Sequence, residues 1–332
     1  MQIPDGRKLI VGVGSALVDI LVHADDAFLN AVGAVKGGMV YVDRDRIERT
    51  LAQASAAPAV VPGGSACNTV VGVAQLGGPA RFVGTCGRGP MGRFYEDSLR
   101  GRGVEPRLFR SDAPTGRVLS IITPDAQRSM FTFLGAASET RPDDIRPEGF
   151  AGAAVVHIEG YLLFNPELIL AALKAASAAG ARVSLDLASF NVVEESRGLL
   201  TEIVGEFVDI LIANEDEARA YTGETDPGRA LAALQRGVEI AALKLGPAGS
   251  LVSCGGRTAR IAARGDGAAV DTTGAGDLWA AGFLFGLVGG YDLEACGALG
   301  SACGFEVCQV VGASIPADGW ARIRKLLAKG AE

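Results

Sequence analysis

Short apolar runs alternate with longer segments of helical periodicity along most of the chain. Nearly continuous apolar runs of this kind are typical of strands that are buried on both faces of a sheet. We predict such strands at residues 8–13, 80–84, 154–159, 182–186, 208–213 and 240–245. Helices are predicted at 166–179, 215–222, 276–288, 292–307 and 317–329. Strands and helices in alternation form an α/β fold with a doubly wound, mainly parallel sheet flanked by helices.

Two stretches, at about 15–43 and 108–134, depart from this pattern. Residues 118–122 and 129–133 alternate between apolar and polar side chains, and the turn at 124–127 joins them into a predicted β-hairpin with one solvated face. We expect the two stretches to form a small, discontinuous β-sheet lid over the carboxyl ends of the main strands, where open α/β sheets bind ligands. No linker or repeat divides the chain, so residues 1–332 are predicted to form a single domain.

The composition of the chain argues against several classes of protein. The formal net charge of −7 offers no basic face to nucleic acid. Two histidines and six cysteines without a CxxC pair argue against a zinc site and a disulfide framework. The first residues contain no apolar run long enough for a signal peptide, and the chain contains no charge-free apolar stretch of about 18 residues. We therefore expect a cytoplasmic protein that does not cross a membrane. We expect small molecules as its partners, and either a monomer or a homodimer.

The most specific motif is the segment AVDTTGAGDLWAAGFLFGL at residues 269–287. Gly274, Ala275 and Gly276 at the start of a helix leave backbone N–H groups free to hold a phosphate. A carboxylate at the end of that loop would repel phosphate, so Asp277 is better suited to accept a proton from an attacking hydroxyl. The alternative is that Asp277 only caps the helix. The glycine-rich turn and the second acid, Asp271, favour catalysis.

DTTGAGD followed by a helix rich in Ala and Gly resembles the second signature of the ribokinase-like (PfkB) carbohydrate and nucleoside kinases. The first signature is matched by PGGSACNT at residues 62–69. Further similar segments follow the family order over almost the whole chain, at 84–104, 114–118, 213–223, 244–250 and 311–316. The resemblance implies a ribokinase-like fold and transfer of the γ-phosphoryl group of ATP to a hydroxyl. A P-loop kinase is excluded because the sequence contains no Gly-Lys pair.

On the donor side, the resemblance makes Asp277 the catalytic base and the N–H groups of Gly274, Ala275 and Gly276 its anion hole. It also implies a set of residues around ATP, namely Asn214, Lys244, Gly246, Gly249 and Thr272.

Two metal sites are implied by the same resemblance. Asn214 and Glu217 match an Asn-x-x-Glu motif that organises Mg²⁺ through its waters. A capping box at the start of a helix is the alternative interpretation of this pair. Asp271 and the carbonyl of Thr273 match a monovalent-cation site suited to K⁺.

On the acceptor side, Asp19 matches an acid that holds two sugar hydroxyls, a task that suits a carboxylate. Gly63, Gly64 and Asn68 match the sugar-binding loop, although Gly63-Gly64 taken alone would indicate an ordinary turn. Arg128 precedes the second alternating strand and matches an arginine that swings toward the phosphates in nucleoside kinases. An exposed turn arginine is the alternative.

The segments GSALVDI, GGSACNT and VVGASIP are more similar to the adenosine kinase-like branch than to ribokinases or fructokinases. Met130, Thr132 and Leu134 would share one face of a lid strand, where apolar groups suit a flat base. These features favour adenosine as the acceptor and a role in purine salvage. Ser15 stands where the nucleoside branch usually has Asn, so a sugar kinase similar to ribokinase, fructokinase or 2-keto-3-deoxygluconate kinase stays open. A non-catalytic regulatory protein is disfavoured, because Asp277 and the loop before it are intact.

Overall fold

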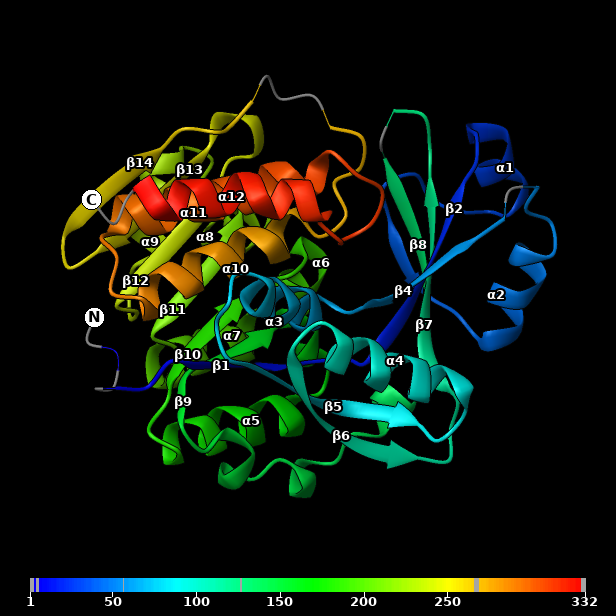
Figure 1. Cartoon of the computed structure of the whole chain (residues 1–332), viewed down its shortest axis with the longest axis horizontal. Coiled ribbons are helices and arrows are strands. Elements are labelled where there is room, and N and C mark those ends of the chain that lie inside the picture. Colours follow the sequence, from blue (N-terminus) through cyan, green and yellow to red (C-terminus); the bar gives the residue numbers. More distant parts are fainter. Residues whose placement is uncertain (1–2, 4–5, 56, 126, 266–268, 330–332) are drawn as a thin grey trace.

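A nine-stranded sheet runs through the larger part of the molecule, and a five-stranded sheet lies beside it (Figure 1). The structure is a computed structural model that describes residues 3, 6–55, 57–125, 127–265 and 269–329. The strands of the larger sheet follow the order β14 (Arg257–Ile261), β13 (Ser250–Cys254), β12 (Ile240–Lys244), β11 (Ile210–Asn214), β10 (Arg182–Asp186), β9 (Ala153–Glu159), β1 (Leu9–Val13), β5 (Ala80–Gly87) and β6 (Val104–Ser111).

The larger sheet is parallel from β12 to β6, and β13 and β14 extend it as antiparallel strands. The apolar runs of its central strands are buried because helices cover both faces. Parallel register brings the last residues of neighbouring strands together, so Glu159 pairs with Asp186 and Asn214 with Lys244. The predicted doubly wound, mainly parallel sheet is confirmed.

Helices cover the larger sheet in two layers with separate apolar clusters. One layer contains α3 (Ser65–Gln75), α4 (Pro90–Gly101), α10 (Ala275–Val288), α11 (Leu293–Cys308) and α12 (Ala317–Lys329). The other contains α5 (Pro166–Ala178), α6 (Phe190–Glu195), α7 (Arg197–Phe207), α8 (Glu215–Thr222) and α9 (Pro227–Leu234). Among the described residues, none of the helices is long and apolar enough to cross a membrane.

The smaller sheet has the order β3 (Met39–Tyr41), β8 (Arg128–Gly135), β7 (Thr115–Ile122), β2 (Leu17–His23) and β4 (Ala59–Gly63). We call this sheet the lid. Two helices, α1 (Asp26–Ala31) and α2 (Arg44–Leu51), pack on its outer face through Leu29 and Ile47. Figure 1 shows the lid on the right, beyond the ends of β1 and β5. Its other face is left to line a cavity with the larger sheet.

The predicted boundaries of the lid need two corrections. Residues 108–111 belong to β6 of the larger sheet, where Leu108 pairs with Gly84. Leu108, Phe109 and Arg110 are only partly buried because β6 is an edge strand, so this segment lacks the continuous apolar run of the central strands. The second correction is β4, which pairs with β2 in the lid but lies outside the two predicted stretches. Ala126 in the predicted turn lies outside the described residues.

Candidate active site

Two cavities meet at the N-terminus of α10. The lid cavity lies between the lid and the carboxyl ends of the larger sheet, and the body cavity lies along α10 and α11. Both are lined by the same five residues, Asn214, Lys244, Thr272, Ala275 and Gly276. Asp277 lines the lid cavity only. A ligand in one cavity can therefore reach a ligand in the other at the start of α10.

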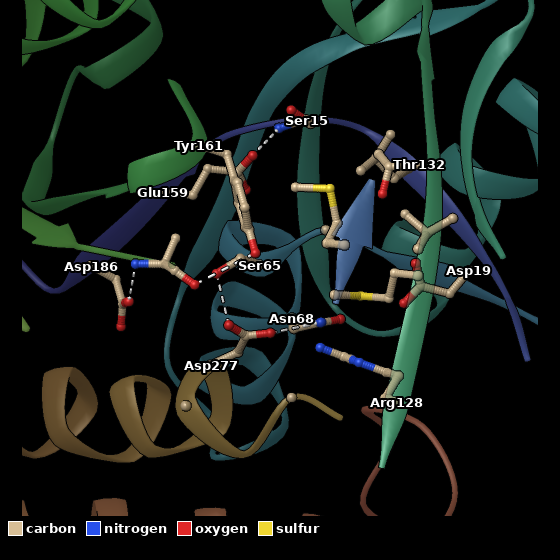
Figure 2. Close-up of a pocket in the computed structure, with 18 of the residues that line it drawn as sticks. Ser15, Asp19, Ser65, Asn68, Arg128, Thr132, Glu159, Tyr161, Asp186 and Asp277 are labelled. Atoms are coloured by element: carbon tan, nitrogen blue, oxygen red, sulfur yellow. Dashed lines mark hydrogen bonds between the residues drawn. The ribbon is translucent and has the colours of Figure 1, made fainter. Parts of the chain in front are cut away.

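Asp277 is held by two side chains of α3, as Figure 2 shows. The Ser65 hydroxyl donates to Oδ1 at 2.7 Å, and the Asn68 amide donates to Oδ2 at 2.9 Å. Burial raises the pKa of Asp277 above its usual range, while these two hydrogen bonds act in the opposite direction. A carboxylate with a raised pKa, fixed beside a cavity, is suited to accept a proton. Ser65 was not predicted as a site residue, although it lies within the quoted motif.

The loop before α10 has the form of an anion site. Gly274 adopts a left-handed conformation with φ of 75°, and a Cβ there would lie 2.6 Å from the Cβ of Ala313, so glycine is required. The Ala275 N–H donates a hydrogen bond to the Thr272 carbonyl at 3.1 Å. The N–H groups of Gly274, Gly276 and Asp277 make no hydrogen bond to another described residue. These three amides, rather than the predicted Gly274–Gly276 set, are free to bind an anion at the helix N-terminus.

Asp271 fixes the shape of this loop. One carboxylate oxygen accepts from the Thr273 N–H at 2.9 Å and from its hydroxyl at 2.7 Å. The other accepts from the Gly312 N–H at 2.7 Å. Asp271 is completely buried, so these bonds replace its contacts with water. The Asp271 carboxylate thereby joins the loop to the segment before α12.

Asp19, on β2, points into the lid cavity. Burial raises its pKa to about 7, although the guanidinium of Arg128 lowers it. Gly63 does not line the cavity but makes room for Asp19, because a Cβ at this position would lie 2.2 Å from the carboxyl group. Gly64 and Asn68 do line it. The structure thus brings most of the predicted acceptor residues together around Asp19.

Arg128 begins β8 and extends from the lid toward Asn68 and Asp277 (Figure 2). No hydrogen bond or ion pair joins its guanidinium to another residue that the structure describes. Ser15 also lines the lid cavity, and its backbone N–H donates to Glu159 at 2.8 Å. Both residues therefore line the same cavity as Asp19 and Asp277.

Two acids in the lid cavity were missed by the sequence analysis. Glu159 ends β9 and accepts the N–H groups of Ser15 and Ala66, and burial raises its pKa to about 7. Asp186 ends β10 and accepts from Lys244 Nζ at 2.8 Å. Both stand at the carboxyl ends of predicted parallel strands, where ligands of α/β proteins bind. That position was the signal that could have identified them.

Small and aromatic residues line the body cavity. Gly246 and Gly249 form the turn after β12, opposite Trp279 and Phe305. Thr272 contributes an exposed side chain at the junction of the cavities. A flat ligand that carries phosphates fits this combination of an apolar slot and an anion site.

A model of the pfkB family carbohydrate kinases matches residues 29–319 of the sequence. The chain belongs to this family. It is 35% identical to the adenosine kinase from Sinorhizobium meliloti, with a TM-score of 0.89 over 98% of this chain and 100% of that one. A probable sugar kinase from Rhizobium etli CFN 42 is 33% identical, with a TM-score of 0.90 over 97% and 99%. A fructokinase from Klebsiella pneumoniae is 31% identical over 75% of this chain and 84% of its own.

This pfkB-family kinase is a phosphotransferase that acts on a hydroxyl acceptor, with ATP as the co-substrate that the family implies. Its fold is that of the ribokinase-like adenosine and sugar kinases. The similar proteins divide between nucleoside and sugar kinases, so they leave the acceptor open.

In this kinase, Asn214 and Glu217 form the capping box at the start of α8. The Asn214 side chain accepts from the Glu217 N–H at 2.9 Å, and both carboxylate oxygens of Glu217 accept from Asn214. Among the described residues, no group of three or more His, Cys, Asp or Glu could hold a metal by itself. Mg²⁺ usually keeps several waters and binds through one or two carboxylates and substrate phosphates. The buried Glu217 in the wall of the lid cavity fits that manner of binding.

Proposed function

We propose that this protein is an ATP-dependent nucleoside kinase, with adenosine as the favoured acceptor. The observation that carries the proposal is the apolar wall of the lid cavity beside Asp19. This wall consists of Leu17, Met39, Val118, Met130 and Leu134. A free sugar presents hydroxyls on most sides, so it would leave such a wall without an apolar partner. A nucleoside offers a flat base to the wall and ribose hydroxyls to Asp19.

In this proposal the acceptor hydroxyl lies beside Asp277, and the triphosphate of ATP extends from the body cavity to the start of α10. Asp277 takes the hydroxyl proton as the acceptor oxygen forms a bond to the γ-phosphorus. The bond from that phosphorus to the β,γ-bridging oxygen breaks, and ADP leaves. The free amides of Gly274, Gly276 and Asp277 stabilise the charge of the transferring group. Arg128 enters from the lid and adds a positive charge.

Two cations belong to the proposal. Glu217 and Asn214 would hold Mg²⁺ through its waters, and the ion would neutralise charge on the phosphates. Asp271 and the Thr273 carbonyl would hold K⁺ behind the anion site. Three hydrogen bonds already occupy most of the acceptor positions of Asp271, so one carboxylate lone pair is left for such an ion.

A sugar kinase is the second candidate. Ser15 supports it, because the hydroxyl of serine reaches less far toward a base than an asparagine amide would. In a sugar kinase, Met130 and Leu134 would close over a small acceptor rather than stack on a base.

The deciding experiment measures ADP formation from Mg·ATP with adenosine, inosine, guanosine, ribose, fructose and 2-keto-3-deoxygluconate. We expect the highest kcat/KM with adenosine. A sugar with a higher kcat/KM than every nucleoside would replace the proposal with the second candidate.

A further inference from the structure

Lys244 occupies the junction of the two cavities. Of the five described residues that line both cavities, it alone carries a charge. It ends β12, next to Asn214 at the end of β11, so the parallel register fixes its place at the edge of the sheet. The donor and the acceptor would meet at this point.

The ammonium group of Lys244 lies against the start of α10. A Cβ built at Gly276 would lie 3.0 Å from Nζ. The free N–H groups of Gly276 and Asp277 belong to the same turn. A cation and the N-terminal amides of a helix therefore face one space, which is an arrangement suited to a phosphoryl group.

Asp186 holds the ammonium group in this position. Its Oδ2 accepts from Nζ at 2.8 Å, and its Oδ1 accepts from the Ala188 N–H at 2.9 Å. The side chains of Lys244 and Asp186 are only 14% and 7% exposed, so few conformations are open to either. Burial lowers the pKa of Lys244, but the carboxylates of Asp186 and Glu217 outweigh it and raise the pKa above its usual value. Lys244 is thus charged.

Lys244 also has hydrogen-bond donors that could bind a ligand. An ammonium group has three N–H donors, and among the described residues only Asp186 accepts one of them. Among the described residues, seven Asp, Glu, Lys or Arg side chains line the lid cavity, of which five are acids and two, Arg128 and Lys244, are cations. A phosphoryl group that enters this cavity thus has two cations to meet, and Lys244 is the one that is fixed at its point of entry.

We propose that Lys244 is a catalytic cation, which contacts the γ-phosphoryl group during its transfer and is held for that purpose by Asp186. The inference rests on the proposed kinase function but not on the identity of the acceptor. As the bond to the bridging oxygen breaks and the bond to the acceptor oxygen forms, the two remaining donors of Lys244 bind oxygens of the transferring group. The proton still goes to Asp277.

The experiment must separate this role from a structural ion pair. Lys244→Met alone leaves a buried Asp186 unpaired and destabilises the fold. The double variant Lys244→Met with Asp186→Asn removes both charges, and Asn keeps an acceptor for the Ala188 N–H. We expect the double variant to fold, to keep its acceptor KM and to lose about 10²–10³-fold in kcat, the loss seen when one donor to a transition state is removed. A kcat equal to that of the wild type would overturn the proposal.

A second readout does not depend on turnover. Aluminium fluoride beside Mg·ADP mimics the transferring phosphoryl group, and calorimetry gives the affinity for ADP with and without it. The wild type should gain affinity from the fluoride and the double variant should not, while both bind ADP alone equally. If the double variant kept the gain, Lys244 would not contact this group, even if the wild type phosphorylated none of the acceptors tested.

A matched control is the pair of Arg81 and Glu105, which joins β5 and β6 at 2.8 Å and lines neither cavity. Arg81→Met with Glu105→Gln also removes both charges of an ion pair. This control should keep its kcat and its response to aluminium fluoride. Equal losses in the two double variants would identify a general effect of removing ion pairs and overturn the proposal.

Discussion

The Asp277 carboxylate accepts two side-chain hydrogen bonds that a helix cap alone does not require. Asp277→Asn preserves the shape but cannot take up a proton. A positioned base contributes about 10²–10⁴-fold, so we expect kcat to fall by that factor. Stability should change little, because Asn keeps the size of the side chain and an oxygen that can still accept a hydrogen bond from α3. Steady-state kinetics and thermal unfolding test both parts.

Asp292 is a suitable control for Asp277. It caps α11 by accepting the Ala295 N–H at 2.7 Å, and it lines neither cavity. Asp292→Asn should therefore keep its kcat. A variant of Asp277 that lost stability and kept its kcat would show that this residue only joins α10 to α3.

A second prediction concerns Asp19. Asp19→Asn removes a carboxylate that would accept hydrogen bonds from the hydroxyls of the substrate. Hydrogen bonds to charged groups contribute about 1.5–3 kcal/mol each. We expect the acceptor KM to rise about 10–100-fold and the KM for ATP to stay unchanged. Asp43→Asn serves as the control, because Asp43 caps α2 on the outer side of the lid. An unchanged acceptor KM would remove Asp19 from the acceptor site.

The site residues that the sequence could predict belong to the motifs that carry the family resemblance. Asp277, Asn68 and Gly64 stand in these motifs, and the structure brings all three to the lid cavity. Glu159 and Asp186 belong to no such motif, and their position at the carboxyl ends of predicted strands was the only signal that the sequence offered. Their function depends on partners far away in sequence, such as Ala66 for Glu159.

At the scale of elements, the loop from Asp271 to Gly276 carries a third prediction. If K⁺ binds behind this loop, exchange of K⁺ for tetramethylammonium at constant ionic strength should lower kcat, because the larger ion cannot enter a site of oxygen atoms. The hydrogen bonds of Asp271 to Thr273 and Gly312 persist without the ion, so the unfolding temperature should change little. Equal kcat values in the two salts would show that these bonds alone hold the loop.

Strand β8 carries a fourth prediction, since Met130 lies in the apolar wall of the lid cavity. Met130→Ser removes part of the surface offered to a base but leaves Asp19 in place. We expect kcat/KM to fall about 10-fold for adenosine, which corresponds to the 1–3 kcal/mol of a modest apolar contact. The ratio of adenosine to ribose activity is the measurement, and Met91→Ser on α4, outside both cavities, is the control. An unchanged ratio would argue against a base at this wall.

The elements that the sequence placed wrongly share one physical cause. A half-exposed strand has the same pattern of apolar and polar residues whether it belongs to the edge of the larger sheet or to the lid. The pairing that decides between them, Leu108 with Gly84 for β6 and Ile20 with Val60 for β4, is made by residues distant in sequence. The fully buried strands have no such ambiguity, and their predicted positions agree with the structure.

At the scale of the whole molecule, buried acids make stability depend on pH. Burial raises the pKa values of Asp19, Glu159 and Glu217 to about 7 in the folded protein, against about 4 in an unfolded chain. Between these values the folded state binds more protons, so the free energy of unfolding falls as the pH rises through about 7. His157 has the opposite effect, but only at lower pH, because its folded pKa is about 4.

We therefore expect the ligand-free protein to lose unfolding free energy from pH 6.5 to 8, and the Asp19→Asn variant to lose less. Urea titrations at several pH values measure the difference. If the unfolding free energy fell equally with pH in both proteins, the raised pKa of Asp19 would be contradicted.

The hydrogen bonds from Ser65 and Asn68 to Asp277 join residues 212 and 209 positions apart. A ribosome therefore delivers α3 long before α10. Until then the face of α3 around Gly72, which packs on Leu278 and Ala281, has no cover. Neither substrate can stabilise the nascent chain, because the anion site has yet to be made. The growing polypeptide therefore exposes apolar surface that is prone to aggregation until the docking of α10 closes the core.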